Sequence, residues 1–225
     1  EQDQQKNATY KNAMVGAISF YGAVTDDQNG PERLRSFYSA HMPQDRAVTF
    51  KRDFERHLDI LEGKLDPSII KLLLCDGQRA LWNYADHNRR FDSYEKLVDF
   101  HHTEEHLSKA AEALFGKTSK NGQGWYWKYK VKLLERAGGA EAVLRSIDYH
   151  SRTRRLSRSN RKALSTERTF FWRNKHRMSY ACFRRRGLPI GSGPVEAACK
   201  SIVKTRLCRS GMRWSRQGGQ RILDL

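Results

Sequence analysis

The sequence has few cysteines, and their arrangement excludes a zinc site built on cysteine pairs. The 225-residue chain has four, Cys75, Cys182, Cys199 and Cys208, with no Cys-x-x-Cys pair among them and no zinc-ligand spacing. Cys75 ends an apolar run and Cys199 falls on the apolar face of a predicted helix, so we expect both to be small buried hydrophobic residues. Such usage is typical of a reducing compartment.

Long apolar runs are also missing. No stretch is long enough to span a bilayer and no signal peptide is visible, so we expect no membrane partner. The chain begins at Glu1 rather than at a methionine and ends in RILDL within an apolar pattern. We therefore expect a fragment of a longer protein.

Acidic residues are scarce in the last third of the chain. Residues 1–151 hold 22 basic and 22 acidic side chains, whereas residues 152–186 hold 13 basic side chains and only Glu167 as an acid. Residues 187–225 add 7 basic and 2 acidic side chains, so the whole net charge of +17 lies after residue 151. A charge block of this kind indicates a surface for a polyanion such as nucleic acid. A solvated or disordered basic segment is the alternative.

The elements expected along the chain indicate an α/β fold with a mixed sheet. Residues 1–9 are polar and read as a frayed end, and a hairpin with an Asn-Gly turn is predicted over about 12–42. A helix follows from about 45 to 63, and the apolar run 69–75 predicts a central strand buried on both faces. The remaining expectations are a helix to about 88, a strand over 94–100, a helical stretch over about 101–180 and a helix over about 194–207.

Two carboxylates stand at positions where chemistry is possible, although local rules also explain them. Asp76 immediately follows the strand 69–75, where ligands gather in open α/β sheets, but it is also placed to cap the next helix. Glu196 falls in the first turn of the last helix after Gly193 and Pro194, where a carboxylate favours the helix dipole. Pairing with Lys200 is a further structural explanation. The surrounding arginines and lysines remain unexplained by these rules.

Several motifs together carry a resemblance to a known family. DGQRALW after the apolar strand, DFHHTEEHL at the start of the helical stretch, and GSGPVEAACKSIVKTRL followed by GMRWS are similar to the catalytic core of an insertion-sequence transposase. The chain resembles the Kra-type branch of the Mutator-like superfamily of DDE transposases over about residues 11–223. The GSGxVE element with its GMRW tail is the specific part.

The resemblance implies a ribonuclease-H-like mixed sheet with an all-helical insertion. Such enzymes carry one acid on the first strand, a second after the fourth strand, to which Asp76 corresponds, and a glutamate on a late helix, to which Glu196 corresponds. Neither Asp3 nor the hairpin-tip residues Asp26 and Asp27 suit the first position, so the sheet is expected to lack its first strand and the first acid to lie upstream. The expected domains are core residues 1–100, a helical insertion over 101–180, basic at its C-terminal end, and core residues 181–225 with the glutamate helix.

By the same resemblance, Asp76 and Glu196 are expected to be catalytic and to bind metal, with two Mg²⁺ or Mn²⁺ ions in the complete site. Two such ions 3.5–4 Å apart neutralise the attacking and leaving oxygens in phosphodiester displacement. The expected partner is DNA, both at the transposon ends and at the target site. We also expect the protein to form a homo-oligomer and to act in the bacterial cytoplasm, beside the nucleoid. The side chains expected to contact DNA are Arg184, Arg185, Arg186, Lys200, Lys204, Arg206, Arg213 and Trp214.

Alternative functions remain open on the sequence. The first is DNA cleavage and strand transfer by the complete parent protein, and the second is a catalytically incomplete DNA-binding fragment or a decayed transposase. A third is a zinc hydrolase, because His102-Thr-Glu-Glu-His106 fits the H-x-x-E-H pattern.

Asp99 and His102 match an Asp-x-x-His element of Mutator-like enzymes, or else form a structural hydrogen bond where the insertion begins.

Aromatic and basic runs have two interpretations as well. Trp125, Tyr126, Trp127 and Tyr129 form an aromatic cluster with the neighbouring lysines 128, 130 and 132, and they either stack on bases or pack an insertion helix. Trp172 also stands in basic sequence. The run SRTRRLSRSNRK over 151–162 is expected to be a flexible phosphate-binding surface rather than a reader of bases.

Overall fold

The computed structural model describes residues 13–23, 30–210 and 212–224, which divide into two compact units. Unit 1 comprises residues 1–22, 33–69 and 193–225, and unit 2 comprises residues 23–32 and 70–192. The polar end at 1–9, which includes Asp3, lies outside the described residues, as do Asp26 and Asp27.

Unit 1 is built on the predicted hairpin. Strands β1 (Met14–Tyr21) and β2 (Arg33–His41) pair antiparallel, with Met14 opposite His41 and Ser19 opposite Ser36. Helix α1 (Val48–Glu62) follows a short 3₁₀ turn, η1 (Asp45–Ala47), and packs on this hairpin. A Cβ at Gly16 would stand 2.8 Å from the ring of Phe54, so glycine allows α1 this close approach to β1.

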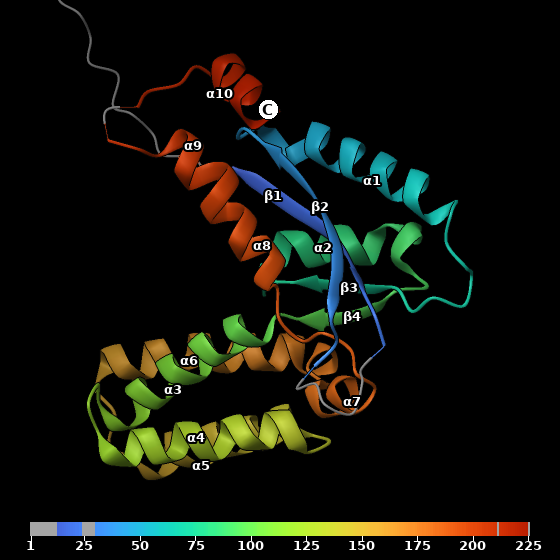
Figure 1. Ribbon diagram of the computed structural model, residues 1–225. Coiled ribbons are helices and arrows are strands. Elements are labelled where there is room, and N and C mark those ends of the chain that lie inside the picture. The colour runs from blue at the N-terminus through green and yellow to red at the C-terminus, as the bar shows by residue number, and fades with distance from the viewer. Residues whose placement is uncertain (1–12, 24–29, 211, 225) are drawn as a thin grey trace, which may run out of the picture. The chain divides into compact units, whose positions relative to one another are not determined.

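The C-terminal part of unit 1 is one long helix followed by a short one. α8 (Gly193–Ala198) continues into the π-helical segment η4 (Cys199–Lys204) and then α9 (Thr205–Leu207), which confirms the predicted helix. α10 (Arg216–Leu223) is joined to the end of β2 because the Gln220 side chain accepts from the Met42 backbone N–H at 2.9 Å. Figure 1 shows α1 and the α8–α9 helix on opposite sides of the hairpin.

Unit 2 begins with a small parallel sheet. β3 (Leu72–Cys75) pairs in parallel with β4 (Glu95–Val98), and α2 (Arg79–His87) with the turn η2 (Arg89–Phe91) connects them. The prediction of a central strand buried on both faces is wrong for 69–75: Ile69 and Ile70 are exposed, and the residues of β3 are half-buried. Within the described residues β3 has one neighbouring strand, so it is also not a central strand there.

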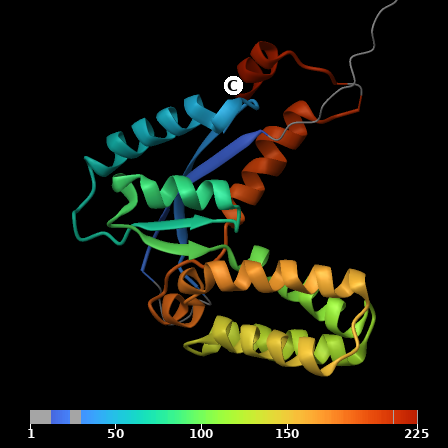
Figure 2. The ribbon, with the colours of Figure 1, turned by 180° about the vertical axis from the view of Figure 1, so that it is seen from behind.

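The rest of unit 2 is the predicted helical stretch. It contains α3 (Phe100–Phe115), α4 (Lys120–Glu135), α5 (Gly139–Thr153), α6 (Arg158–Asn174), the turn η3 (Lys175–Arg177) and α7 (Tyr180–Arg185). α3 and α5 each pack against both α4 and α6, which makes a four-helix bundle visible from both sides in Figures 1 and 2.

The basic run 151–162 is not the flexible segment that we predicted. Its first residues end α5 and its last residues begin α6, with only residues 154–157 between the two helices. Ser157 caps α6 by accepting a hydrogen bond from the Asn160 N–H at 3.1 Å. Serine before a helical pattern is a strong start signal, and here it outweighs the high charge.

The chain is therefore mixed α/β, as predicted, but its described strands form two sheets of two strands rather than one mixed sheet. The boundaries of the units also differ from those of the predicted domains, since β3, α2 and β4 belong with the helical stretch. Among the described helices, none is both long enough and apolar enough to cross a bilayer.

Candidate functional site

Asp76 lies at the carboxyl end of the parallel β3–β4 pair. Its Oδ1 accepts a hydrogen bond from the Gln78 N–H at 3.0 Å, and its backbone carbonyl accepts from the Trp82 indole at 2.8 Å. A Cβ on the next residue, Gly77, would stand 2.2 Å from the Phe170 ring, so only glycine fits against α6 there. The turn that carries Asp76 is thus held by α2 on one side and by α6 on the other.

The Asp99 carboxylate is a structural acceptor. Its side chain is 2% exposed, with Oδ1 accepting from the His102 N–H at 2.8 Å and Oδ2 accepting from the Ser192 N–H. The Asp99 backbone N–H donates to the Cys75 carbonyl at 2.8 Å, one residue before Asp76. With both oxygens engaged, Asp99 fits the structural alternative considered for the Asp-x-x-His element, although it binds the His102 backbone rather than its ring.

A buried hydroxyl pair extends this network to α7. The Thr103 hydroxyl lies 2.7 Å from the Tyr180 hydroxyl, which donates to the Val98 carbonyl at 3.0 Å. Burial raises the pKa of Tyr180 well above its usual range, so this phenol is a permanent hydrogen-bond donor. The end of β4, the start of α3 and the start of α7 are consequently fixed to one another.

The loop that precedes the glutamate helix is held by the same end of α3. The Phe100 N–H donates to the Ile190 carbonyl at 2.9 Å, two residues before the Ser192 N–H that binds Asp99. A Cβ on Gly191 would lie 3.2 Å from the His101 ring, so the small residues of the GSG element permit this close packing. Residues 190–192 therefore lie beside the carboxyl ends of β3 and β4.

Glu196 lies in the first turn of α8, in unit 1, and its side chain is exposed. The ion pairs and hydrogen bonds of the described residues do not include its carboxylate, so the pairing with Lys200 that was considered as a structural explanation is absent. Burial raises the pKa of the nearby Cys199 thiol, and the negative charge of Glu196 adds to this effect. Each unit thus supplies one of the two predicted acids. Within the described part of the chain, no three His, Cys, Asp or Glu side chains are grouped to hold a metal.

Three of the predicted DNA contacts lie in unit 2, at the end of α7, and one of them is already paired. Arg186 makes two hydrogen bonds to the Glu95 carboxylate, with Nη1 to Oε2 at 2.6 Å. This guanidinium lowers the pKa of Glu95. Arg185 donates to the Ala181 carbonyl and Arg184 to the Leu134 carbonyl. Arg184 therefore keeps most of its donors for a phosphate, whereas the charge of Arg186 is compensated within the protein.

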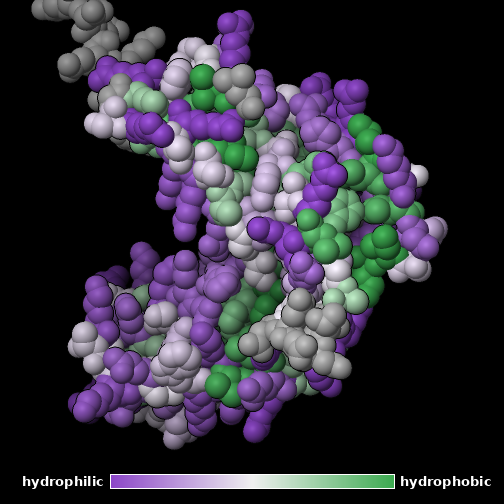
Figure 3. All heavy atoms as spheres, in the orientation of Figure 1, coloured by the Kyte–Doolittle hydropathy of each residue, from purple (hydrophilic) through white to green (hydrophobic). Residues whose placement is uncertain are grey.

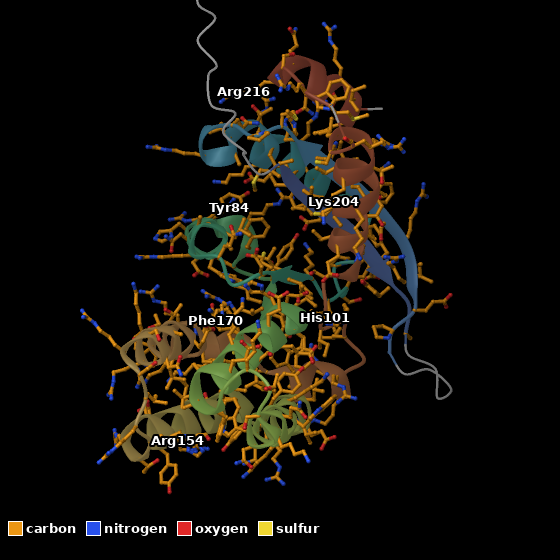
Figure 4. All side chains as sticks on the ribbon, turned by 90° about the vertical axis from the view of Figure 1, so that its left-hand side faces the viewer. Tyr84, His101, Arg154, Phe170, Lys204 and Arg216 are labelled. Atoms are coloured by element: carbon orange, nitrogen blue, oxygen red, sulfur yellow. The ribbon has the colours of Figure 1, made fainter. Side chains whose placement is uncertain are left out.

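The other predicted DNA contacts lie in unit 1. Lys200, Lys204 and Arg213 are exposed, whereas Arg206 is half-buried and donates to the Ile222 carbonyl at 3.4 Å. Figure 4 labels Lys204 on the long helix and Arg216 on α10. The indole of Trp214 donates to the Leu207 carbonyl at 3.2 Å, and its ring is 40% exposed. Its N–H is therefore used within the fold, although the ring face remains accessible.

Helix α6 places part of the predicted phosphate-binding run 151–162 on one basic face together with Trp172 and Arg173. Its buried side is formed by Leu164, Glu167, Phe170, Phe171 and Asn174. At helical spacing the opposite side carries five exposed residues, Arg158, Arg161, Lys162, Trp172 and Arg173. On the near side of the bundle, where α3 and α4 lie, Figure 3 shows many hydrophilic side chains; α6 lies on the far side in this view. The signal was present as a 3.6-residue period, but the density of charge over 152–186 concealed it.

The aromatic cluster of α4 divides between the two interpretations. Trp125 and Tyr129 are buried, and the Trp125 indole donates to the Ser146 hydroxyl at 2.8 Å, so these two rings pack the bundle. Trp127 is 57% exposed, with the Lys130 ammonium 4.9 Å from its ring. Of the two tryptophans of α4, Trp127 is therefore the one that is accessible to a base.

All four cysteines are free thiols. Burial raises the pKa of Cys75 to about 12. A thiol of this kind stays protonated, so Cys75 is neither a nucleophile nor a metal ligand beside Asp76. No family model, curated protein or solved structure matches the chain. Its function is therefore argued from these residues and their contacts.

Proposed function

We propose that this chain is part of the catalytic core of a DDE-type DNA transposase, which cleaves and joins DNA strands in the complete parent protein. The observation that carries the proposal is the position of Asp76. It leaves a parallel strand pair at its carboxyl end, where α/β folds place their chemistry, and α6 packs against the same turn and is basic on its outer side.

The two separate strand pairs support the proposal of a ribonuclease-H-like sheet in which one strand is missing from the described residues. A strand has two edges, so a single additional strand is able to pair with both the antiparallel hairpin and the parallel pair. The ribonuclease-H-like fold of the proposed family contains a first strand that carries the first acid. In this proposal that strand and its aspartate are supplied from outside the described residues.

Chain connectivity supports the participation of Glu196. Ser192 is bound to Asp99, and Asp99 is bound to the carbonyl next to Asp76. Glu196 follows Ser192 by four residues, and four residues span at most about 14 Å even when fully extended. In the proposal this short tether allows Glu196 to share metal ions with Asp76.

The donor chemistry of the two acids fits hard divalent cations. Asp76 and Glu196 offer carboxylate oxygens, which Mg²⁺ and Mn²⁺ prefer, and would hold the ions together with the third acid. Such ions neutralise charge on the oxygens that attack and leave in phosphodiester displacement. The exposed arginines and lysines of α6, α7 and the α8–α9 helix would hold the DNA backbone and offset its repulsion from the acids.

The test is substitution of each acid in the full-length parent protein. Glu196→Gln and Asp76→Asn, made singly, are expected to abolish strand transfer and leave DNA binding intact, because each removes a charged ligand without a change of size. Asp92→Asn is the matched control, since Asp92 is exposed and follows the turn η2. Strand transfer that survives either substitution would show that the acid has only a local structural role.

DNA binding without catalysis is the second candidate function. It requires only the exposed basic side chains of α6 and of the α8–α9 helix, which bind phosphates without a metal. A parent protein that binds transposon-end DNA but shows no Mg²⁺-dependent cleavage would establish this alternative. Dimerisation of the parent, which is needed to hold two DNA ends, is part of the first proposal only.

A further inference from the structure

His102 and His106 form a close pair on α3 that the proposed phosphodiester chemistry does not use. One turn of helix separates them, and their Nε2 atoms lie 3.3 Å apart. The Nδ1 of His106 lies 2.5 Å from Oε2 of Glu167, a buried carboxylate on α6. The His106 ring also stacks on Phe170 with a centroid separation of 3.5 Å and an angle of 15° between the rings.

The contact with Glu167 determines which nitrogen of His106 is available. A carboxylate accepts hydrogen bonds only, so Nδ1 of His106 carries the proton, and the Nε2 of neutral His106 is left with a lone pair. This lone pair faces the Nε2 of His102. The two nitrogens are therefore joined either by a hydrogen bond from the Nε2–H of His102 or by a metal ion.

We propose that this pair binds a divalent transition-metal ion of the Zn²⁺ class through the two Nε2 atoms. In tetrahedral coordination with metal–nitrogen bonds of 2.0–2.1 Å, two nitrogens are separated by about 3.3–3.4 Å. The observed distance of 3.3 Å between the two Nε2 atoms matches this nitrogen–nitrogen separation. Imidazole nitrogen suits Zn²⁺, Ni²⁺ and Cu²⁺ rather than Mg²⁺, so the site differs in donor chemistry from the acid pair.

Glu167 has the position of a supporting partner. Histidines that bind metals usually donate their second ring N–H to a carboxylate, which fixes the tautomer and raises the basicity of the ligand. Glu167 does this from a different helix, and Phe170 holds the plane of the ring. The pair is thus oriented by α6 before any ion arrives, which lowers the cost of ordering it.

Water completes the coordination. The described residues offer no third His, Cys, Asp or Glu in the group, and the His102 side chain is 31% exposed, so solvent reaches the remaining positions. The same Phe170 ring packs against Gly77, next to Asp76. A bound ion would therefore stabilise the packing of α3 on α6 at the turn that carries the catalytic aspartate.

The experiment is a titration of the metal-free chain with Zn²⁺ by calorimetry and with Co²⁺ by visible absorption. We expect one saturable site per chain, with a Co²⁺ spectrum typical of nitrogen and oxygen ligands. His102→Ala removes one ligand from a half-exposed position and is expected to weaken binding by about tenfold or more. Glu167→Gln is expected to weaken binding by about 10–100-fold because it removes the orienting carboxylate.

His87→Ala is the matched control, since this exposed histidine of α2 bonds only the Asn83 carbonyl of its own helix. It is expected to leave the affinity unchanged. Binding that survives His102→Ala undiminished would assign the metal to other groups, such as the exposed thiols of Cys182 and Cys208, and would overturn the proposal. A wild-type chain with no saturable binding would show that the two rings share a proton. Because the readout is metal binding, either result leaves the transposase proposal untouched.

Discussion

Asp99 is the residue on which most of the contacts around the proposed site converge. Its two carboxylate oxygens accept backbone N–H groups from His102 and Ser192, and its own N–H donates to the Cys75 carbonyl. A buried carboxylate that accepts two such bonds binds the loop before α8 to the ends of β3 and β4. Asp99 is therefore a positioning residue in the proposed enzyme.

Asp99→Asn tests this role. The amide has a single acceptor oxygen, so one of the two N–H groups would face an NH₂ donor inside the protein. We expect the free energy of unfolding to fall by about 2–3 kcal/mol, measured by urea denaturation. The exposed control Asp92→Asn is expected to change it by less than about 0.5 kcal/mol. Equal effects of the two variants would contradict the structural role of Asp99.

Gly77 is required by packing rather than by backbone conformation. A Cβ there would stand 2.2 Å from Cε2 of Phe170, and this ring is held in place by its stack on His106. We expect Gly77→Ala to lower the free energy of unfolding by about 1–3 kcal/mol through overpacking.

Gly124→Ala on α4 is the matched comparison, because its Cβ would meet nothing within 4 Å. Alanine is a better helix former there, so this variant is expected to gain about 0.5–1 kcal/mol. Opposite signs for the two changes in one denaturation series are the expected result. A neutral Gly77→Ala would show that the turn carrying Asp76 is free to move away from α6.

The pair of Arg186 and Glu95 predicts a pH dependence of stability. Hydrogen bonding to Arg186 lowers the pKa of Glu95 in the folded protein, so its contribution is fully present above the unfolded pKa of about 4.3. The contribution is lost as the pH falls through the folded pKa. The pair is half-exposed, so the effect is small and is screened by salt.

Glu95→Gln is accordingly expected to lower stability at about pH 7 and to have little effect at about pH 3. Thermal unfolding of the variant and the wild type at both values measures the difference. A difference that is constant with pH would assign the effect of the substitution to packing instead of charge.

At the scale of elements, α6 contributes to both proposals through its two faces. Its inner face contributes Glu167 to the histidine pair and Phe170 to the turn at Gly77. Its outer face exposes the basic side chains described above. Helical periodicity places these sets on opposite sides, so substitutions on the outer face leave the packing of the bundle unchanged.

Substitution of three outer arginines by glutamine, at Arg158, Arg161 and Arg173, tests the DNA-binding role of this face. For each phosphate that the protein no longer neutralises, the slope of log affinity against log salt concentration decreases in magnitude by about 0.9. We therefore expect the magnitude of the slope to fall by about 2–3 in fluorescence anisotropy, with unchanged thermal stability.

The control replaces three exposed lysines of equal total charge that lie outside α6, Lys109, Lys117 and Lys120. These are expected to leave the slope nearly unchanged. If both triple variants reduce the magnitude of the slope equally, DNA binding depends only on the net charge of the chain, and α6 has no specific role in it.

At the scale of the whole molecule, the net charge of +17 and its confinement to the last third predict strong, salt-dependent association with DNA. Several phosphate contacts would give a slope of magnitude about 5 or more. The chain by itself is expected to bind duplex DNA without Mg²⁺-dependent cleavage, because the proposed site lacks its third acid. Anisotropy across a salt series and a nicking assay measure the two parts. Binding that does not change with salt would remove the electrostatic basis of the proposal.

Local patterns in the sequence were sufficient to predict most elements. The hairpin, the two later strands, the helical stretch and the last long helix follow from strand-forming residues, a continuous apolar run, period-3.6 spacing, turn residues and caps. These signals act over a few residues and need no partner. The prediction that the basic run 151–162 is flexible was wrong, because the high charge density drew attention away from the helix cap at Ser157.

The contacts around the site were decided by tertiary structure. Asp99 meets Ser192 across 93 positions of chain, and His106 meets Glu167 across 61, so no local rule relates these residues. The pairing of Arg186 with Glu95 likewise depends on how α7 packs beside β4, and it removed one cation from the predicted DNA surface. The sequence by itself determined which elements form and where charge accumulates, because propensity and charge are local properties. Tertiary packing alone decided which acids are engaged and which carboxylate orients His106, because those depend on contacts between segments far apart in the chain.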